Sequence, residues 1–281
     1  MIIVKIKGGL GNQLFQYAVG RAVALRHKVP LKLDTTIFET YNLHNGYRLD
    51  QFAIQAEIAA DNEIINLKGR NNLLFSAFRK VGLAKRKSYV KEKRSSYFDA
   101  SVFKNNFVYL DGYWQNELYF SDIRELLLKE LSLNSSINDL SCAYLECIKK
   151  SNSVSLHVRR GDYLNLKNIN VLEVDYYMKA AEYIRKNVEK PTFYIFSDDL
   201  EWCKSTLAFL DDCIYVERTQ TEIDDLKLMS FCQHNIIANS SFSWWGAWLN
   251  QNPNKTVVAP KGWIINDPDS SNVIPSDWVK F

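Results

Sequence analysis

The chain has 281 residues, more than the roughly 100 to 200 residues of one typical domain, so two lobes are expected. Its 47% hydrophobic and 24% charged residues are ordinary for a globular protein and exclude a disordered chain or a fibre. The five cysteines are odd in number and lack a CxxC spacing, which indicates neither a disulfide framework nor a zinc site and fits a cytoplasmic protein. The most aromatic stretch, residues 242–249, is far shorter than the roughly 20 apolar residues that span a bilayer.

The first half of the chain opens with a strand, a glycine-rich loop and a helix. The predicted elements are a strand over residues 2–7, the loop "GGLGNQ" over 8–13, a helix over 14–28 and a strand over 29–34. The pattern loosens after residue 57, then returns as a strand over 107–115 and an amphipathic helix over 121–133. The residues between 134 and 152 are polar and turn-rich, and we expect the boundary between the lobes there.

Strand and helix patterns alternate throughout the second half. The predicted strands are residues 153–158, 192–199, 213–217, 235–241 and 255–260. The predicted helices are residues 175–190, 200–210, 221–232 and 241–250. Thr221 and Asp224 are placed for a capping-box-like start of the third helix. This alternation predicts βα crossovers and a parallel sheet, whose ligands bind beyond the carboxyl ends of the strands.

Three polar segments directly follow strands of this predicted sheet. They are "HVRRGD", "FSDD" and "NSSFS", which begin at His157, Phe196 and Asn239. Because the carboxyl ends of parallel strands meet at one edge of a sheet, we expect these segments to converge on one rim.

The first loop, "GGLGNQ", lies between a strand and a helix, where glycines let backbone N–H groups approach an anion. It resembles half of a dinucleotide fingerprint, because Leu14 replaces the third glycine, while Asp34 lies at a plausible distance for a ribose contact. The alternative is a simple tight turn. Asn12 and Gln13 favour ligand binding, since both are polar and lie at the turn.

The segment "HVRRGDY" is the stronger signal. Arginine offers a fixed fork of donors that matches phosphate oxygens and keeps its charge, so Arg159 and Arg160 suit a diphosphate. Asp162 would orient the guanidinium beside it. The alternative is a structural ion pair between Asp162 and one of the arginines. His157 is equally consistent with a buried core histidine and with a ligand contact.

The other two segments have similar alternatives. Asp198 and Asp199 could contact a ribose or a guanine edge, or could cap the following helix. Ser240, Ser241 and Ser243 lie at a helix start, where hydroxyls and backbone donors bind phosphate. The tryptophans that follow are expected in the core. The one D-x-D sequence, at residues 267–269, lies in a proline-bearing turn and is not expected to bind a metal.

Residues 79–94 hold eight basic residues and one acidic residue. Such a run is typical of a solvated segment, and the alternative is a peripheral contact with an anionic membrane. Nucleic acid is not expected as a partner, because the basic residues are confined to this one segment and are not interleaved with a stacking platform.

The segments "GGLGNQLFQYA", "GYWQNELYF", "HVRRGDY", "FSDD" and "NSSFSWWGAWL", in this order and spacing, resemble the family 11 glycosyltransferases, the α-1,2-fucosyltransferases, in their short bacterial form. The resemblance covers nearly the whole chain. It implies an α/β fold of GT-B type, with two Rossmann-like lobes that face each other across a cleft. Residues 1–150 would form the N-terminal, acceptor-side lobe, and residues 151–281 the C-terminal lobe that binds GDP-fucose.

The resemblance also implies roles for single residues. Arg159 would be the essential diphosphate arginine and Asp198 would contact the base, while Asn12 would reach across the cleft. The catalytic candidates are Arg159, Asp162 and Asn12. The residues expected to bind the donor are Gly9, Gly11, Asn12, Gln13, His157, Arg159, Arg160, Asp198, Asn239, Ser240, Ser241, Phe242 and Ser243.

The implied reaction is transfer of L-fucose, with inversion, from GDP-β-L-fucose to the 2-hydroxyl of a galactose-terminated glycan, without a metal or other cofactor. The general base stays open: nothing acidic follows the arginine pair before Glu173 apart from Asp162, which is the nominal candidate. The alternatives are a fucosyltransferase for another acceptor, a nicotinamide-dependent oxidoreductase built on the first loop and Asp34, and a carbohydrate-binding module. The expected location is the cytoplasm, with peripheral contact at the inner membrane as an extension.

Overall fold

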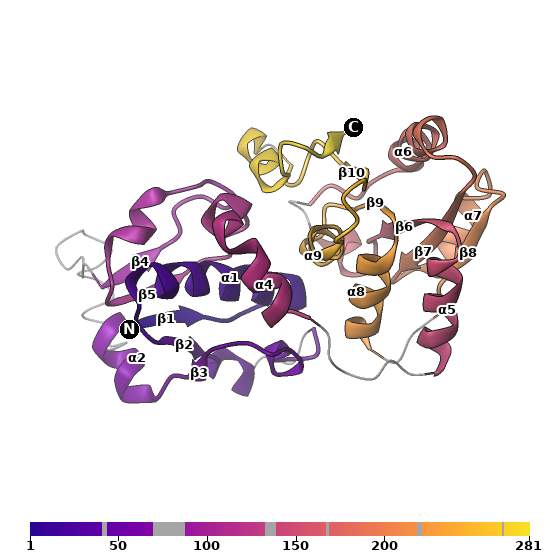
Figure 1. The fold of residues 1–281 in the computed structure, drawn as a ribbon. Helices are drawn as coiled ribbons and strands as arrows, with labels where there is room; N and C mark the ends of the chain where they lie inside the picture. Colours follow the sequence, from indigo (N-terminus) through magenta and orange to yellow (C-terminus); the bar gives the residue numbers. More distant parts are fainter. Residues whose placement is uncertain (41–43, 70–87, 133–138, 167–168, 218–220, 266) are drawn as a thin grey trace. The chain divides into compact units, whose positions relative to one another are not determined.

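The computed structural model divides into two compact units, Met1–Ser132 and Leu133–Phe281, each built on its own parallel sheet (Figure 1). The structure describes residues 1–40, 44–69, 88–132, 139–166, 169–217, 221–265 and 267–281. Residues 79–87, most of the basic segment, therefore lie outside the described part of the chain. Within the described part, no helix combines the length and apolar character needed to cross a bilayer.

The first unit has a five-stranded sheet in the order β3-β2-β1-β5-β4. Its strands are β1 (Ile2–Lys5), β2 (Leu31–Asp34), β3 (Glu57–Ile58), β4 (Tyr89–Lys91) and β5 (Val108–Asp111). Its described helices are α1 (Leu10–His27), α2 (Asp61–Lys68) and α4 (Arg124–Glu130). The central strand β1 is buried on both faces, which explains its continuous apolar run.

Helix α1 packs closely on this sheet because Gly20 has no side chain. A Cβ atom at Gly20 would collide with Val4 of β1 and with Leu31 of β2. The helix begins at Leu10, four residues before the predicted start at Leu14. Gly11, Asn12 and Gln13 therefore lie within the helix and not in the preceding loop.

The second unit has a six-stranded sheet in the order β11-β10-β9-β6-β7-β8, with all neighbours parallel. Its strands are β6 (Asn152–Val158), β7 (Pro191–Ser197), β8 (Cys213–Tyr215), β9 (His234–Ile236), β10 (Val257–Ala259) and β11 (Val279–Lys280). Its described helices are α5 (Asp139–Lys149), α6 (Val174–Asn187), α7 (Leu200–Thr206), α8 (Glu222–Phe231) and α9 (Ser241–Leu249).

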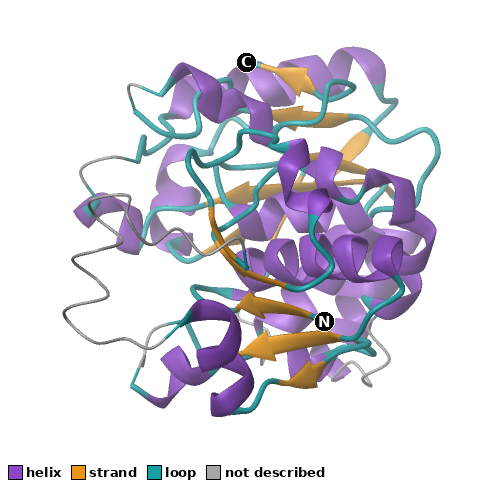
Figure 2. Ribbon diagram, turned by 90° about the vertical axis from the view of Figure 1, so that its left-hand side faces the viewer, coloured by secondary structure: helices purple, strands orange, loops and turns teal. Residues whose placement is uncertain are grey.

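Helices cover both faces of this sheet. Figure 2 distinguishes the helices, strands and loops of the chain by colour. Strand β7 illustrates the two layers, because Phe193 and Ile195 join the core formed with α6 and α7. The alternate residues Tyr194 and Phe196 join the core formed with α5 and α8. A strand buried on both faces reads as a continuous hydrophobic run, as the sequence "TFYIF" does.

The predicted alternation of strands and helices is confirmed in this unit, with most strands shorter than expected. Thr221 caps α8 as predicted, because its side chain accepts a hydrogen bond from the backbone N–H of Asp224. Helix α6 begins at Val174 with Glu173 as the N-cap, one residue before the predicted Asp175. By contacts, α5 belongs to the second unit, so the division falls at residues 132/133, whereas the sequence suggested 150.

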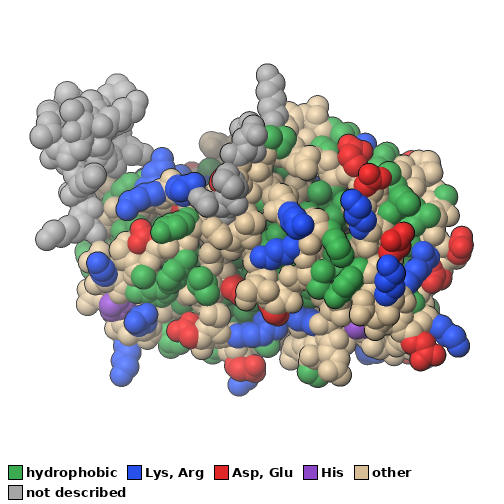
Figure 3. All heavy atoms as spheres, turned by 90° about the horizontal axis from the view of Figure 1, so that it is seen from above, with side chains coloured by type: hydrophobic (Ala, Val, Ile, Leu, Met, Phe, Trp, Pro, Cys, Tyr) green, Lys and Arg blue, Asp and Glu red, His purple; other side chains and the backbone are tan. Residues whose placement is uncertain are grey.

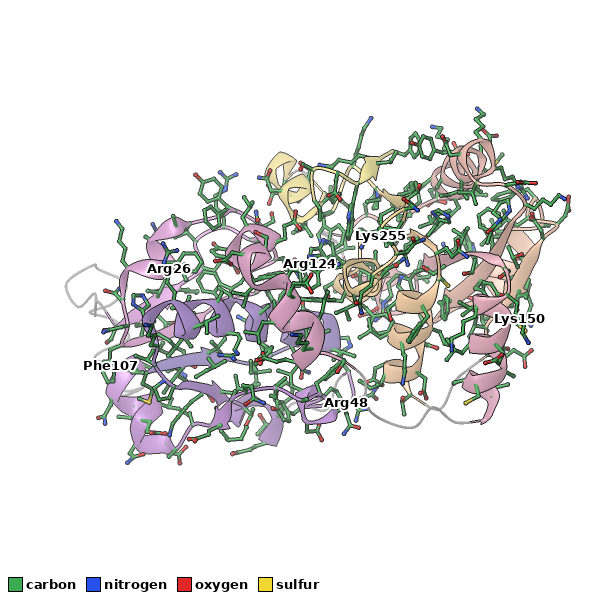
Figure 4. The ribbon with its side chains drawn as sticks, viewed as in Figure 1. Arg26, Arg48, Phe107, Arg124, Lys150 and Lys255 are labelled. Atoms are coloured by element: carbon green, nitrogen blue, oxygen red, sulfur yellow. The ribbon has the colours of Figure 1, made fainter. Side chains whose placement is uncertain are left out.

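The tryptophans of α9 are core residues, as expected. Trp244 and Trp245 are fully buried and Trp248 is 3% exposed. Lys255, labelled beside this helix in Figure 4, donates hydrogen bonds to the carbonyl oxygens of Ala247 (2.7 Å) and Asn250 (2.8 Å). A cation at this end of a helix satisfies its last carbonyl groups and complements its dipole.

Candidate functional site

Each sheet has a point where the direction of chain connection reverses, and ligands of open parallel sheets bind beside such points. In the second unit the chain runs outward from β6 to β7 and β8, then returns to β9 on the other side of β6. In the first unit β2 and β5 lie on opposite sides of β1. Ligands are therefore expected beside the loops after β6 and β9 and beside those after β1 and β5.

The Arg159 guanidinium lies between two carboxylates in the second unit. Its Nη2 is 2.8 Å from Asp162 Oδ1, and its Nη1 is 3.1 Å from Asp198 Oδ2. The side chain is still 28% exposed, so solvent or a ligand can reach it. The ion pair that was the alternative interpretation of Asp162 is therefore present, and Arg159 is its partner.

The side chain of Arg160 is engaged elsewhere. Its guanidinium lies 4.1 Å from the ring centre of Trp202, and its Nε is 3.4 Å from Asp199 Oδ2. Asp199 also caps α7 by accepting a hydrogen bond from the backbone N–H of Trp202 (3.1 Å). The two arginines thus bind different acids, and the guanidinium of Arg160 is held against α7.

Gly161 allows the loops after β6 and β7 to meet. A Cβ atom at Gly161 would lie 2.6 Å from Asp198 Oδ2. The backbone N–H of Arg160 donates to the other carboxylate oxygen, Asp198 Oδ1, at 2.9 Å. Asp198 therefore binds both the backbone of this loop and the Arg159 guanidinium, which leaves no room for a side chain between them.

The loop after β9 joins the same rim. The Tyr163 hydroxyl donates to the carbonyl oxygen of Asn239 at 3.2 Å. Together with the Arg159–Asp198 pair, this contact confirms the predicted convergence of the loops after β6, β7 and β9. The Asn239 side chain is buried and donates to the Asn170 carbonyl oxygen (2.7 Å), while its Oδ1 has no partner within the described residues.

Two of the serines at the start of α9 make hydrogen bonds within the first turn of the helix. Ser240 is the N-cap, and its Oγ accepts from the backbone N–H of Phe242 at 3.3 Å. Ser243 is buried and its hydroxyl donates to the Ser240 carbonyl oxygen. Ser241 and Phe242 are partly exposed. No acidic residue lies in the first turn, so the positive end of the helix dipole is not neutralised there.

His157 is buried directly beneath this rim. It is 5% exposed, and its ring centre lies 5.9 Å from that of Phe242. Burial, with a contribution from the Arg159 charge, lowers the pKa of His157 to about 3, so the ring is neutral near pH 7. Its Nδ1 atom has no hydrogen-bond partner in the described part of the chain.

In the first unit, an amide pair spans the corresponding point between β1 and β5. The Gln115 Nε2 donates to the Asn12 Oδ1 at 2.7 Å. The chain adopts φ = +76° at Gly8, where a Cβ atom would lie 2.8 Å from Asn12 Nδ2. Gly8 is therefore the glycine that this turn requires, whereas Gly9 is an ordinary extended N-cap and Gly11 is a buried helical residue.

Two further residues of the first unit have structural partners. The buried Gln13 side chain donates to the carbonyl oxygens of Gly8 (2.9 Å) and Gly46 (2.8 Å) and accepts from the backbone N–H of Arg48, a residue labelled in Figure 4. Asp34 is 1% exposed and accepts a hydrogen bond from the Tyr109 hydroxyl at 2.5 Å. Its burial and this bond count against a ribose contact, and hence against the nicotinamide alternative.

The described residues contain no group of three or more His, Cys, Asp or Glu side chains that could hold a metal ion. The side chain of Asp269, in the D-x-D turn, lies outside the described residues. Gly8, Gly161, Tyr163 and Gln115 were not among the predicted site residues. Gln115 lies in the segment "GYWQNELYF", one of those that carry the resemblance to the family. That segment could have pointed to Gln115, but no role was assigned to its glutamine.

The sequence model of glycosyl transferase family 11 matches residues 1–280. An alpha-1,2-colitosyltransferase from Escherichia coli is 33% identical over 296 aligned positions, which cover 100% of this chain and 99% of the relative. The mouse galactoside 2-alpha-L-fucosyltransferase Sec1 is 24% identical, over 89% of this chain and 64% of the relative.

The structure of Arabidopsis thaliana FUT1 in complex with GDP is similar with a TM-score of 0.54 and 11% sequence identity. The match covers 95% of this chain and 72% of that chain. At this identity the similarity shows the fold alone, and the expected GT-B type, with two Rossmann-like units, is confirmed.

Proposed function

Because the chain belongs to glycosyl transferase family 11, we propose that it transfers L-fucose from GDP-β-L-fucose to the 2-hydroxyl of a terminal β-galactoside. The observation that carries this proposal is the Arg159 guanidinium, fixed by Asp162 and Asp198 at the rim of the second sheet. Its permanent charge and planar donors match the oxygens of a diphosphate.

The proposed chemistry follows from where charge develops. When the bond between the sugar and the diphosphate breaks, the sugar becomes oxocarbenium-like and the phosphate gains negative charge. A cation held in place before the reaction stabilises that charge without reorganising, so it acts more strongly in the transition state than in the ground state. Arg159 supplies this cation, and the start of α9 adds backbone N–H donors with an unneutralised helix dipole.

A β-linked donor and an α-linked product require inversion by a single displacement. The acceptor hydroxyl attacks from the face opposite the leaving diphosphate and loses a proton during the reaction. Asp162 is the proposed base or, through its ion pair with Arg159, a positioning residue. Asn12 is a further proposed contact to the GDP-sugar donor.

The donor sugar has a specific second candidate. One relative is named for colitose, the 3-deoxy analogue of L-fucose, and another for L-fucose. These two donors differ by one hydroxyl, which a site built to hydrogen-bond that group distinguishes strongly. A colitosyl donor is therefore the alternative form of the same proposed reaction.

The test is a transfer assay with the purified protein in chelator. It is incubated with lactose and either GDP-fucose or GDP-colitose, and GDP release is measured together with the linkage of the product. An α-1,2-linked trisaccharide from one donor supports the proposal and identifies the sugar. A different linkage would replace the proposed acceptor hydroxyl, and a strict need for manganese would overturn the metal-free mechanism. Sugar binding that is unaffected by GDP, without transfer, would indicate a carbohydrate-binding module.

We also propose that residues 79–94 make a peripheral contact with an anionic membrane on the cytoplasmic side. The described end of this segment includes Lys93, whose side chain is 85% exposed. On the face that Figure 3 presents, Lys and Arg side chains lie among acidic and apolar ones. Binding to vesicles that contain anionic lipid, lost at high salt and absent with neutral lipid, would support this contact.

A further inference from the structure

The Asn12 amide is held in one orientation by a neighbour from a distant part of the chain. Asn12 lies in the first turn of α1, and Gln115 lies four residues beyond the end of β5. The Gln115 Nε2 donates to the Asn12 Oδ1 at 2.7 Å. Because β1 and β5 are neighbours, this bond spans the point at which the connections of the first sheet reverse.

The direction of this hydrogen bond decides what Asn12 can offer a ligand. An amide oxygen accepts hydrogen bonds, whereas the amide nitrogen donates two. With its oxygen bound to Gln115, Asn12 presents its NH₂ group, and no described residue accepts a hydrogen bond from that group. Asn12 is thereby a hydrogen-bond donor, suited to the oxygen atoms of a phosphate or a sugar.

Gln115 is itself held by an unusual loop. The carboxylate of Glu92 accepts hydrogen bonds from the backbone N–H groups of Tyr113 (2.6 Å) and Trp114 (2.9 Å). Trp114 has φ = +58°, in the left-handed region that a bulky residue rarely adopts. Gly112 leaves the space for the carboxylate, because a Cβ atom there would lie 2.8 Å from Glu92 Oε2.

The strained backbone at Trp114 is kept in place by these two hydrogen bonds and by burial. The Trp114 side chain is 1% exposed and packs edge-on against Tyr119, with ring centres 5.7 Å apart. A rare backbone conformation persists only where its surroundings determine it, and such positions cluster at functional sites. The loop therefore delivers Gln115 to Asn12 in a fixed geometry.

We infer that Gln115 is a positioning residue, which turns the Asn12 amide so that its N–H groups face the oxygen atoms of the GDP-sugar donor. The inference rests on the proposed function, in which Asn12 contacts the donor. Gln115 acts through Asn12 and touches neither the nucleotide nor the sugar. Glu92 supports the same arrangement from one step further away.

The test is a double-mutant cycle in the transfer assay, with Asn12→Ala, Gln115→Leu and the combined variant. We expect Gln115→Leu to lower kcat/KM by about 10- to 100-fold, the scale of one hydrogen bond to a charged group. In the Asn12→Ala background the same change should have little further effect, because no amide remains to be oriented. Melting temperatures of all variants show whether each protein is folded.

A second variant tests the direction of the hydrogen bond. Gln115→Glu keeps the size of the side chain but replaces the N–H hydrogen-bond donor with a carboxylate oxygen. Asn12 must then turn its NH₂ group toward residue 115. The Asn12 oxygen would then face the oxygen atoms of the GDP-sugar, and we expect kcat/KM to fall at least as far as in Gln115→Leu. At a pH low enough to protonate residue 115, its carboxyl group can again donate a hydrogen bond to the Asn12 oxygen. Part of the rate should therefore return in this variant alone.

The matched control is Gln16→Leu. Gln16 is a buried glutamine of the same helix, and its amide bonds the backbone N–H and carbonyl of Lys7 (2.9 and 3.2 Å). Gln16→Leu should change kcat/KM by the same factor in the wild-type and Asn12→Ala backgrounds. Equal effects of Gln115→Leu in the two backgrounds, or wild-type kinetics for Gln115→Glu, would overturn the inference while leaving the proposed function intact. Absence of transfer by the unsubstituted protein from either donor would overturn both.

Discussion

Among single residues, Arg159 is the one on which the proposed chemistry depends most. Replacing it with alanine should lower kcat by about 100- to 1000-fold, as for the loss of one preorganised donor to a developing charge. Arg159→Lys keeps the charge but loses the planar fork, so an intermediate rate is expected. GDP release in the transfer assay measures both. Arg185→Ala is the control, because Arg185 pairs with Asp212 on the surface of the same unit. A rate near that of the wild type for Arg159→Ala would remove this residue from the mechanism.

Asp162 has two candidate roles that one substitution separates. Its Oδ1 lies 2.8 Å from the Arg159 guanidinium, so it can orient that group, and it is also the proposed base. Asp162→Asn keeps an oxygen that can orient Arg159 but cannot take a proton from the acceptor. If Asp162 only orients, kcat should fall by less than about tenfold; if it is the base, the loss should reach about 100-fold or more. Rates are measured at saturating donor and acceptor, and Asp162→Ala should be slow in either case.

At the scale of secondary-structure elements, the site is the meeting point of loops that follow adjacent parallel strands. Gly161→Ala tests that junction, because the added Cβ would lie 2.6 Å from Asp198 Oδ2 and push the loop after β6 away from β7. We expect a loss of about 1 to 3 kcal/mol of stability, the usual cost of overpacking, and a fall in kcat through the displaced Arg159. Denaturant titration and the transfer assay measure the two effects. At Gly262 a Cβ atom would meet nothing within 4 Å, so Gly262→Ala should change neither.

The sequence was sufficient to predict the meeting of these loops, but not the contact between Asn12 and Gln115 in the first unit. Alternating strand and helix patterns imply a parallel sheet, and polar residues after successive strands must then share a rim, as Arg159, Asp198 and Asn239 do. The contact between Asn12 and Gln115 depends on which strand lies beside β1, and local periodicity does not determine strand order. The start of α1 was misplaced because "GGLG" reads as a loop, although only Gly8 has the positive φ that requires glycine.

At the scale of the whole molecule, the two units place different polar groups at the same topological position. Each places polar groups beside the point where its parallel sheet reverses connection, a place that follows from topology and is independent of the residues there. In the second unit these groups are charged, with Arg159 between two carboxylates. In the first unit they are the amides of Asn12 and Gln115. The charged groups suit the diphosphate of the proposed GDP-sugar, and the N–H groups of the Asn12 amide suit its oxygen atoms.

One pH-dependent contribution to the stability of the chain comes from a buried side chain of the second unit, His157. Burial, and to a lesser extent the Arg159 charge, lowers the pKa of His157 from 6.5 to about 3. Below pH 6.5 the unfolded chain therefore takes up a proton at this position while the folded chain does not, and protonation favours unfolding. The stability associated with neutral His157 is fully present above pH 6.5 and is lost progressively as the pH falls toward 3.

At pH 5 this linkage should cost about 2 kcal/mol relative to pH 7, because one pKa unit corresponds to about 1.4 kcal/mol. Urea titrations at the two pH values measure the loss for the wild type and for His157→Gln, which cannot take up the proton. Carboxylates and the other histidines contribute equally to both proteins, so their effects cancel in the difference. We expect the variant to lose about 2 kcal/mol less than the wild type between pH 7 and pH 5. Equal losses in the two proteins would mean that His157 is protonated in the folded chain, and a charged imidazolium would then lie beside the Arg159 guanidinium at the proposed diphosphate site.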